Sequence, residues 1–269
     1  MDDVIKVLQE KLSANRTTYN KKELYWLIQH IGDPSSKIRD DLVCNSFGYG
    51  FLDEKFTVDQ AKYLFNQVKY KNLLFYKIGN NGIPTLTRSF TCLLLFLFIQ
   101  VNGDRTSNYY NFLDEADEKK ILIDLINYLR NETDFIGYSK EYGWIHAVAH
   151  CSDALEVCIK QPIFDQKMLK QFLDSAKQML NQADLRFSCG EEYRFANIFI
   201  TAIELKKLST SEFINWVNNL GIDSNMPNKI YQFYNLKSFC LDLYVKLNDK
   251  GMLDDSLKQF IKTNFSEVY

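Results

Sequence analysis

The hydrophobic and polar positions of this chain alternate with a helical period almost throughout. Apolar residues recur three and four positions apart, and sustained alternation in steps of two, which marks half-buried strands, is nearly absent. The pattern predicts about a dozen helices, over residues 4–12, 24–31, 38–47, 61–76, 91–101, 121–129, 144–160, 164–179, 195–205, 213–220, 230–247 and 253–265. The predicted fold class is therefore all-α, with residues 1–269 forming a single domain.

Signals at the helix ends support these boundaries. Thr57 and Gln60 have the spacing of a capping box, and Pro227 suits the first turn of a helix. The carboxylates of residues 114–118 suit a helix N-terminus, where the helix dipole favours negative charge, although an acidic metal site is an alternative interpretation. Consecutive helices of roughly forty residues per pair favour an α-α superhelix of antiparallel pairs like that of HEAT-repeat proteins, without a strict sequence repeat.

Composition and charge point to a soluble globular protein. The hydrophobic fraction of 46% supplies ample core, and a net charge of −2 gives no basic footprint for nucleic acid. Residues 1–4 carry acids where a secretory signal has bases, so we expect a cytoplasmic protein. The most apolar run, residues 91–101, is about half of the roughly twenty residues that a membrane-spanning helix requires, which predicts a buried helix and no membrane contact.

The six cysteines are widely spaced and contain no C-x-x-C motif. This spacing gives no sign of a zinc knuckle or a redox pair. We expect them to be reduced and mostly buried thiols.

The candidate chemistry lies in residues 143–153, which contain two of the three histidines. If residues 144–160 are helical, His146, His150 and Asp153 stand at i, i+4 and i+7 and project from one face. The two imidazoles are then close enough to share a metal ion, and Asp153 is placed to orient the His150 ring. A third metal ligand must come from another helix, and the available carboxylates are Glu132, Asp134, Glu191 and Glu192.

Other interpretations of the same residues stay open. The histidines are also explained as hydrogen-bonded polar groups on the concave face of a helical array, or as one general acid–base group whose tautomer Asp153 fixes. No H-E-x-x-H motif is present because residue 147 is alanine, and no G-x-S-x-G motif, P-loop or dinucleotide fingerprint occurs. Cys151 follows His150 directly, so on a helix it points about 100° away and is best interpreted as a packed thiol.

Several short motifs resemble a known family. In chain order they are Thr87-Arg88-Ser89-Phe90, residues 128–134, Gly137-Tyr138, the G-W-x-H-A-x-A-H-x-x-D stretch of residues 143–153, and residues 190–194. This order resembles the bacterial family catalogued as domain of unknown function 2785, over about Leu64 to Leu205. Members look like helical-repeat proteins, and the resemblance implies a shared polar site. On the matching positions that site would consist of Arg88, Glu132, Asp134, Trp144, His146, His150, Asp153, Glu191 and Arg194.

One position departs from the family pattern. Ile136 stands where an arginine is expected shortly before Gly137, which removes the contact of that cation.

Two classes of function follow. The preferred one is a non-enzymatic binding protein that holds a protein, peptide or small molecule in a concave groove, with Trp144 as an apolar wall and Arg88 or Arg194 balancing the acids. The alternative is a metal-dependent hydrolase, in which His146 and His150 bind a divalent metal and a carboxylate positions water. No oligomeric state is indicated.

Overall fold

The protein is described by a computed structural model that covers residues 2–14, 18–222 and 227–265. The longer helices are α1 (Asp2–Ser13), α2 (Lys21–Gln29), α4 (Asn45–Leu52), α5 (Val58–Lys71), α6 (Ile83–Gly103), α7 (Glu115–Asn131), α8 (Ala147–Lys160), α9 (Gln166–Gln182), α10 (Glu191–Glu204), α11 (Thr210–Asn218), α12 (Ile230–Asp249) and α13 (Asp255–Phe265). The short elements are α3 (Ser36–Ile38), the π-helix Arg39–Cys44, the 3₁₀ turns Leu73–Phe75 and Pro227–Lys229, and the strands β1 (Tyr138–Ser139) and β2 (Gly143–Trp144). The all-α prediction is confirmed.

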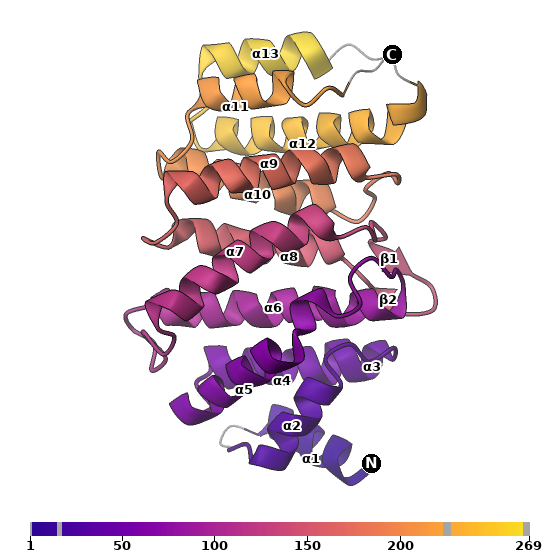
Figure 1. Ribbon diagram of the computed structural model, residues 1–269, viewed down its shortest axis with the longest axis vertical. Coiled ribbons are helices and arrows are strands. Elements are labelled where there is room, and N and C mark those ends of the chain that lie inside the picture. Colours follow the sequence, from indigo (N-terminus) through magenta and orange to yellow (C-terminus); the bar gives the residue numbers. More distant parts are fainter. Residues whose placement is uncertain (1, 15–17, 223–226, 266–269) are drawn as a thin grey trace.

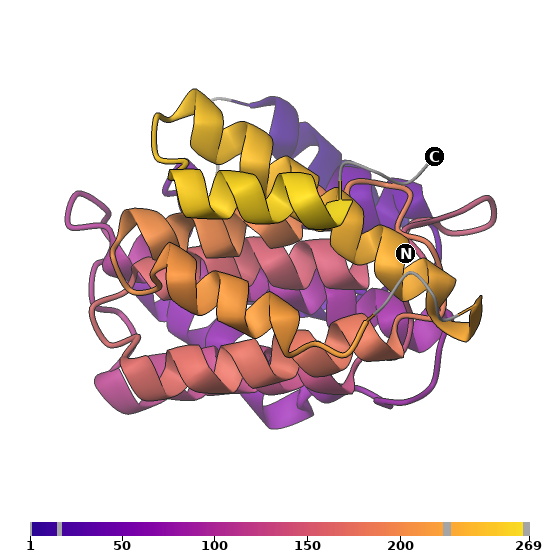
Figure 2. The ribbon, with the colours of Figure 1, turned by 90° about the horizontal axis from the view of Figure 1, so that it is seen from above.

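The helices are stacked along the long axis of the molecule, with α1 near one end and α13 near the other (Figure 1). One row consists of α6, α8, α10 and α12, each packed on the next, and α9 packs on α7 in a second row. Seen along the long axis, α10 overlies α8 and α9 overlies α7 (Figure 2). This is the predicted arrangement of helix pairs in consecutive layers.

The helices of the first row run parallel to one another. Ser89 near the start of α6 contacts His150 near the start of α8, whereas Gly103 at the end of α6 lies against Gln161 at the end of α8. Between α8 and α10, Asp153 pairs with Arg194 and residue 156 contacts residue 201. The N-terminal ends of these helices therefore gather at one edge of the stack, beside the hairpin of β1 and β2 (Figure 1).

Most of the helix ends that the sequence predicted are observed. The Thr57 hydroxyl and the Gln60 side chain make the capping box of α5. The acidic run begins α7, where the Asp114 carboxylate accepts a hydrogen bond from the amide of residue 117 at 2.7 Å. Pro227 begins a 3₁₀ turn directly before α12 rather than the α-helix itself.

Two predicted helices are wrong in detail. The helix expected over residues 38–47 is interrupted, because a π-helical segment, Arg39–Cys44, separates α3 from α4. The helix expected from residue 144 begins at Ala147, because His146 has a positive φ, which a right-handed α-helix cannot accommodate. Gly143 and Trp144 form β2 instead, paired with β1 in an antiparallel hairpin.

Helix α6 is longer than predicted. At 21 residues it passes the length and apolarity of a membrane-spanning helix, with a mean hydropathy of 1.5. However, 67% of its most apolar window is buried, since α8 and α4 pack on it. It is the central core helix of the stack, as its composition predicted.

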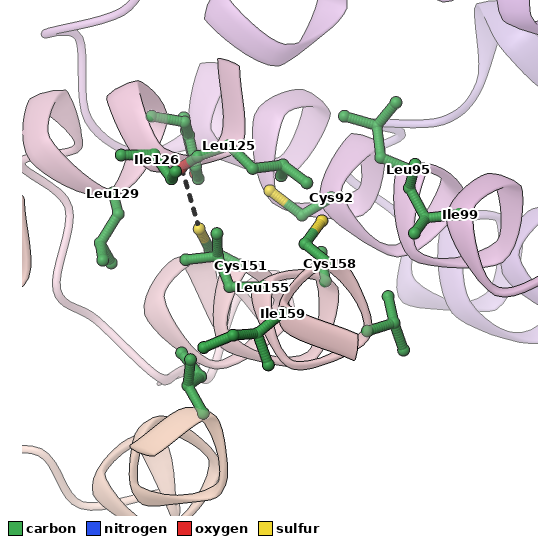
Figure 3. Close-up of a cluster of buried hydrophobic side chains, with 14 of the residues drawn as sticks. Cys92, Leu95, Ile99, Leu125, Ile126, Leu129, Cys151, Leu155, Cys158 and Ile159 are labelled. Atoms are coloured by element: carbon green, nitrogen blue, oxygen red, sulfur yellow. Dashed lines mark hydrogen bonds between the residues drawn. The ribbon is translucent and has the colours of Figure 1, made fainter. Parts of the chain in front are cut away.

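The core between α6, α7 and α8 contains three of the thiols. Cys92, Cys151 and Cys158 lie among leucine and isoleucine side chains, and Cys151 donates to the carbonyl of Leu125 at 3.7 Å (Figure 3). Burial raises the pKa of Cys92 and Cys158 well above the ordinary value of a thiol. All six cysteines are free, and four of them are buried, as predicted.

Candidate functional site

The nine residues predicted from the sequence all lie at the edge where α6, α8 and α10 begin. They divide into a buried cluster around Arg88, a second cluster around His146, and a surface pair. Ser89 follows Arg88 on α6 and contacts the second cluster, so the two clusters adjoin.

The first cluster is a buried ion pair between α6 and the end of α7. The Arg88 guanidinium donates to both carboxylate oxygens of Glu132, each at 2.8 Å, and both side chains are almost completely buried. Its third nitrogen donates to the backbone carbonyls of residues 76, 77 and 80. This bidentate pair therefore fastens the loop before α6 to the loop after α7.

Asp134 completes this cluster. One carboxylate oxygen accepts hydrogen bonds from the amide of Gly82 at 2.8 Å and from the hydroxyl of Thr85 at 2.7 Å. These contacts cap the N-terminus of α6, where the helix dipole favours a carboxylate. Thr85 in turn accepts from Arg88. The Arg88, Glu132 and Asp134 side chains all have hydrogen-bond partners, whereas the buried hydroxyl of Tyr128 beside them has none. The ion pair has the properties of a structural clamp.

The hairpin is held in place from the N-terminal part of the chain. Arg39, on the π-helix, is completely buried, and it donates to the carbonyls of Tyr142 at 2.7 Å and Trp144 at 3.2 Å. Asp40 neutralises its charge through two hydrogen bonds. The cation lies 4.7 Å from the ring centre of Phe90. Arg39 thus fixes the backbone of β2 across more than a hundred residues of sequence.

His146 occupies the N-cap of α8 with φ 48° and ψ 34°. Its ring is buried between Trp144, stacked at 4.5 Å and 19°, and His150, at 5.5 Å between ring centres. The prediction that the two histidines share a helix face is wrong, because His146 precedes the helix. They are neighbours nonetheless.

His150 has a defined tautomer. Ser89 carries one hydroxyl proton and donates it to the carbonyl of Ile145, which can only accept. The Ser89 oxygen must then accept from Nδ1–H of His150, 2.8 Å away. Burial, together with His146 and the nearby arginines, lowers the pKa of His150 well below 6.5. His150 is therefore a neutral imidazole that is protonated on Nδ1.

Glu191 is the carboxylate nearest to His146. Its Oε1 lies 3.3 Å from His146 Nδ1, but the alignment is poor, and both buried atoms lack a hydrogen-bond partner. Its Oε2 accepts from the amides of Ser188 and Cys189. Although burial opposes ionisation, these bonds and His146 lower the pKa of Glu191. The pair is ionisable, buried and incompletely satisfied.

Gly137 makes room for this carboxylate. A Cβ atom at residue 137 would lie 2.1 Å from Oε1 of Glu191 and 2.7 Å from Cβ of Cys189. The Gly137 carbonyl also accepts from the amides of Ile145 and His146. Only glycine lets the segment before β1 pack directly on the start of α10.

The surface pair corrects the predicted role of Asp153. The sequence predicted a hydrogen bond from Asp153 to His150, but the Asp153 carboxylate accepts from Arg194 at 2.7 Å and His150 bonds Ser89. Partial burial raises the pKa of Asp153 to about 6, although Arg194 opposes the shift. Both of the cations predicted to balance acids do so, because Arg88 pairs with Glu132 and Arg194 pairs with Asp153.

The metal interpretation gains no support from this geometry. Within residues 2–14, 18–222 and 227–265, no group of three or more His, Cys, Asp or Glu side chains is placed to hold a metal ion. The acidic run at residues 114–118 is likewise a helix N-terminus.

The accessible part of the site is aromatic. Trp144 is 45% exposed and Tyr138 is 51% exposed, with the two rings edge to face at 4.9 Å. Ile136, in place of the expected arginine, is also exposed. Arg39, Ser89 and Gly137 support the site but were not predicted. Ser89 and Gly137 could have been found from the sequence, because both stand in motifs that resemble the family, whereas Arg39 stands in none of them.

Comparison with known proteins agrees with that resemblance. The family described as "Protein of unknown function (DUF2785)" matches residues 74–245, a longer segment toward the C-terminus than the predicted 64–205. No curated protein and no solved structure matches the chain. Arg39 lies outside the matched segment.

Proposed function

This chain belongs to the DUF2785 family, and from that premise we propose that it is a non-enzymatic binding protein whose hairpin anchors a peptide segment of a partner. The observation that carries the proposal is the fixed exposure of Trp144, which presents a large aromatic surface to solvent on a rigid support.

The support of Trp144 comes from three directions. Arg39 holds its carbonyl, His146 stacks on its ring, and Tyr138 packs edge-on against it. A side chain fixed in this way loses little conformational entropy when a partner binds. Exposed aromatic rings without such support do not offer this advantage.

The residues beside the hairpin suit the same role. Tryptophan, tyrosine and arginine are the residue types most often found at interaction hot spots. Here the partly exposed Arg194 lies close enough to lower the pKa of His150, whose ring neighbours His146 under Trp144. Arg194 and Asp153 would orient polar groups of the partner.

In this proposal the buried histidines are structural and support the exposed Trp144 ring. His150 is neutral and bonded to Ser89, and His146 is covered by Trp144. The metal-dependent hydrolase is the weaker alternative, because His146 and His150 lack a third ligand in the described residues.

The wider context is part of the same proposal. We place the protein in the cytoplasm as a HEAT-like array, with a protein, peptide or small-molecule partner and neither nucleic acid nor membrane. The near-neutral net charge argues against a nucleic-acid partner, and the buried position of α6 argues against contact with a membrane.

The experiment is selection of peptides from a random displayed library on the wild-type protein. We expect Trp144→Ala to weaken the selected peptides roughly 30-fold, the effect of an aromatic hot spot of about 2 kcal/mol. Trp144→Phe should restore part of the affinity. Dissociation constants come from calorimetry.

The matched control is Tyr70→Ala. Tyr70, on α5, is 87% exposed and unsupported, so its removal should leave binding unchanged. Selected peptides that bind Trp144→Ala as tightly as wild type would overturn the proposal. Stoichiometric zinc that is lost in His146→Ala would favour the hydrolase instead.

A further inference from the structure

A second surface lies along the seam between α2 and α5, near the N-terminal end of the stack (Figure 1). It ends in a groove of about 380 Å³, which is lined by α2, the end of α5, the turn after it and α6. The described residues that line the groove include one charged side chain, that of Lys71, and no carboxylate. We propose that this seam binds an acidic peptide segment of a partner protein. The seam contains none of the hairpin residues, so its role is independent of Trp144.

Residues 55–82 are basic, although the chain as a whole is slightly acidic. They contain five lysines and one aspartate, whereas the full sequence has a net charge of −2. The aspartate, Asp59, stands in the first turn of α5, about 18 Å along the helix axis from Lys71. On α2, the Glu23 carboxylate is buried and pairs with Lys11. Neither acid therefore neutralises the cation at the groove.

Three lysines of this surface lie over tyrosine rings. Their Nζ atoms are 5.7 Å (Lys21 over Tyr63), 5.7 Å (Lys71 over Tyr25) and 5.3 Å (Lys77 over Tyr76) from the ring centres. In the described part of the chain, none of the three forms an ion pair with a carboxylate. A tyrosine ring attracts an ammonium group without cancelling its charge. The three positive charges are therefore positioned and remain available to an external anion.

The three cations follow the seam in order. Lys21 begins α2, and Gln29, about two turns further along, lines the groove together with Lys71. Tyr76 lines the same groove and has Lys77 over its ring. From residue 21 to residue 29 the helix rises about 12 Å, which is the length of roughly four residues of extended peptide. A short run of acidic residues therefore reaches more than one of these cations.

The turn that carries Tyr76 and Lys77 is fixed by the ion pair at the start of α6. The Arg88 guanidinium donates to the backbone carbonyls of both residues, at 3.0 and 3.3 Å. Gly32 lets the segment after α2 approach α6 closely, because a Cβ atom there would lie 2.1 Å from the hydroxyl oxygen of Thr87. The backbone around the groove is thus held before a partner binds, which lowers the entropic cost of binding.

Other occupants suit this surface less well. Single-stranded nucleic acid stacks its bases on open aromatic faces. Here an ammonium group lies over each of the Tyr25, Tyr63 and Tyr76 rings. A wholly apolar partner would bury these charges without an anion, which is costly. Acidic side chains supply the anions, and Gln29 and Thr87 offer hydrogen bonds to a peptide backbone.

The test uses two blocked hexapeptides that differ only in charge, Gly-Glu-Glu-Glu-Glu-Gly and Gly-Gln-Gln-Gln-Gln-Gly. Titration at low salt is followed by amide NMR of residues 21–31 and 71–77. The glutamate peptide should bind about tenfold more tightly than the glutamine peptide, as expected from three exposed ion pairs. Its affinity should fall as salt is added, because salt screens exposed charges.

Paired substitutions locate the binding. Lys71→Met together with Lys77→Met removes two of the three cations and should weaken the glutamate peptide about fivefold. Lys71→Arg together with Lys77→Arg keeps the charges and should keep the affinity. The matched control is Lys167→Met together with Lys170→Met, which removes two exposed lysines of α9 and should change nothing.

The glutamate peptide contains no aromatic residue, so Trp144→Ala should leave its binding unchanged. Equal binding of the two peptides, no binding, or equal losses in the two methionine double variants would overturn the acidic-peptide proposal. A thymidine pentanucleotide, which carries the same four negative charges, would also overturn it by binding these residues more tightly than the glutamate peptide. None of these results affects the hairpin proposal, which depends on Trp144.

Discussion

Two polar clusters at the same edge of the stack differ in how completely their groups are paired. Around Arg88, the guanidinium and both oxygens of Glu132 are satisfied, and nothing reaches solvent. Around His146, two facing buried atoms lack partners, and exposed aromatic rings lie above them. The comparison shows that residues from one set of sequence motifs have two different roles. The first cluster fastens the fold, and the second supports a surface.

The largest expected effect comes from breaking the satisfied cluster. Arg88→Met leaves the Glu132 carboxylate buried without a cation, which typically costs about 3–5 kcal/mol of unfolding free energy. Glu191→Gln should cost about 1 kcal/mol, because the amide oxygen can keep the bonds from residues 188 and 189. Urea unfolding measures both. Equal losses in the two variants would remove the distinction between the clusters.

A smaller effect is expected where the second cluster meets the hairpin. Gly137→Ala places a methyl group against the Glu191 carboxylate and should cost about 1–3 kcal/mol through overpacking. The control is Gly48→Ala, where a Cβ meets nothing within 4 Å on a helix and alanine is favoured. If Gly137→Ala is as stable as wild type, the close approach of residue 137 to α10 is not real.

The pH dependence of stability tests the state of His150. Because its pKa in the folded chain lies well below 6.5, the unfolded chain binds a proton below pH 6.5 that the folded chain does not. Stability should therefore fall as pH drops below 6.5, by at most about 1.4 kcal/mol per pH unit. His150→Asn keeps an N–H for Ser89 and should flatten this slope. Parallel curves for the two proteins would contradict a neutral His150.

The smallest effect concerns the surface pair. Arg194→Met should raise the pKa of Asp153 above its value of about 6, because Arg194 lowers it in the native protein. Stability should change by less than about 1 kcal/mol, as for other exposed ion pairs. Carboxyl carbon NMR measures the pKa. A downward shift, or none, would show that Arg194 does not pair with Asp153 in solution.

The sequence was informative wherever the physics is local. Helical periodicity found the elements, and Thr57 and residues 114–118 marked helix starts correctly. The start of α8 was misplaced because His146, a residue without glycine's freedom, adopts a left-handed conformation that the hydrophobic pattern cannot reveal.

Contacts between distant segments were not predictable in the same way. Asp153 lies one turn from His150 and was the expected partner of its ring, yet the Asp153 carboxylate pairs with Arg194 of α10 instead. Arg39 binds β2 across 105 residues of sequence, and nothing in its local pattern indicates that. The site residues were gathered by resemblance to the family, whereas their pairing depends on how the parallel helices align.

The most direct test of the central claim is fluorine NMR of the protein labelled with 5-fluorotryptophan. The chain has three tryptophans, of which Trp144 is exposed on the hairpin and Trp216, on α11, is buried against Phe199 of α10. On titration with a selected library peptide, the Trp144 resonance should shift while that of Trp216 stays constant, and Arg88→Lys should not change which signal moves. Saturable binding that leaves the Trp144 resonance unmoved would contradict the hairpin as the binding surface.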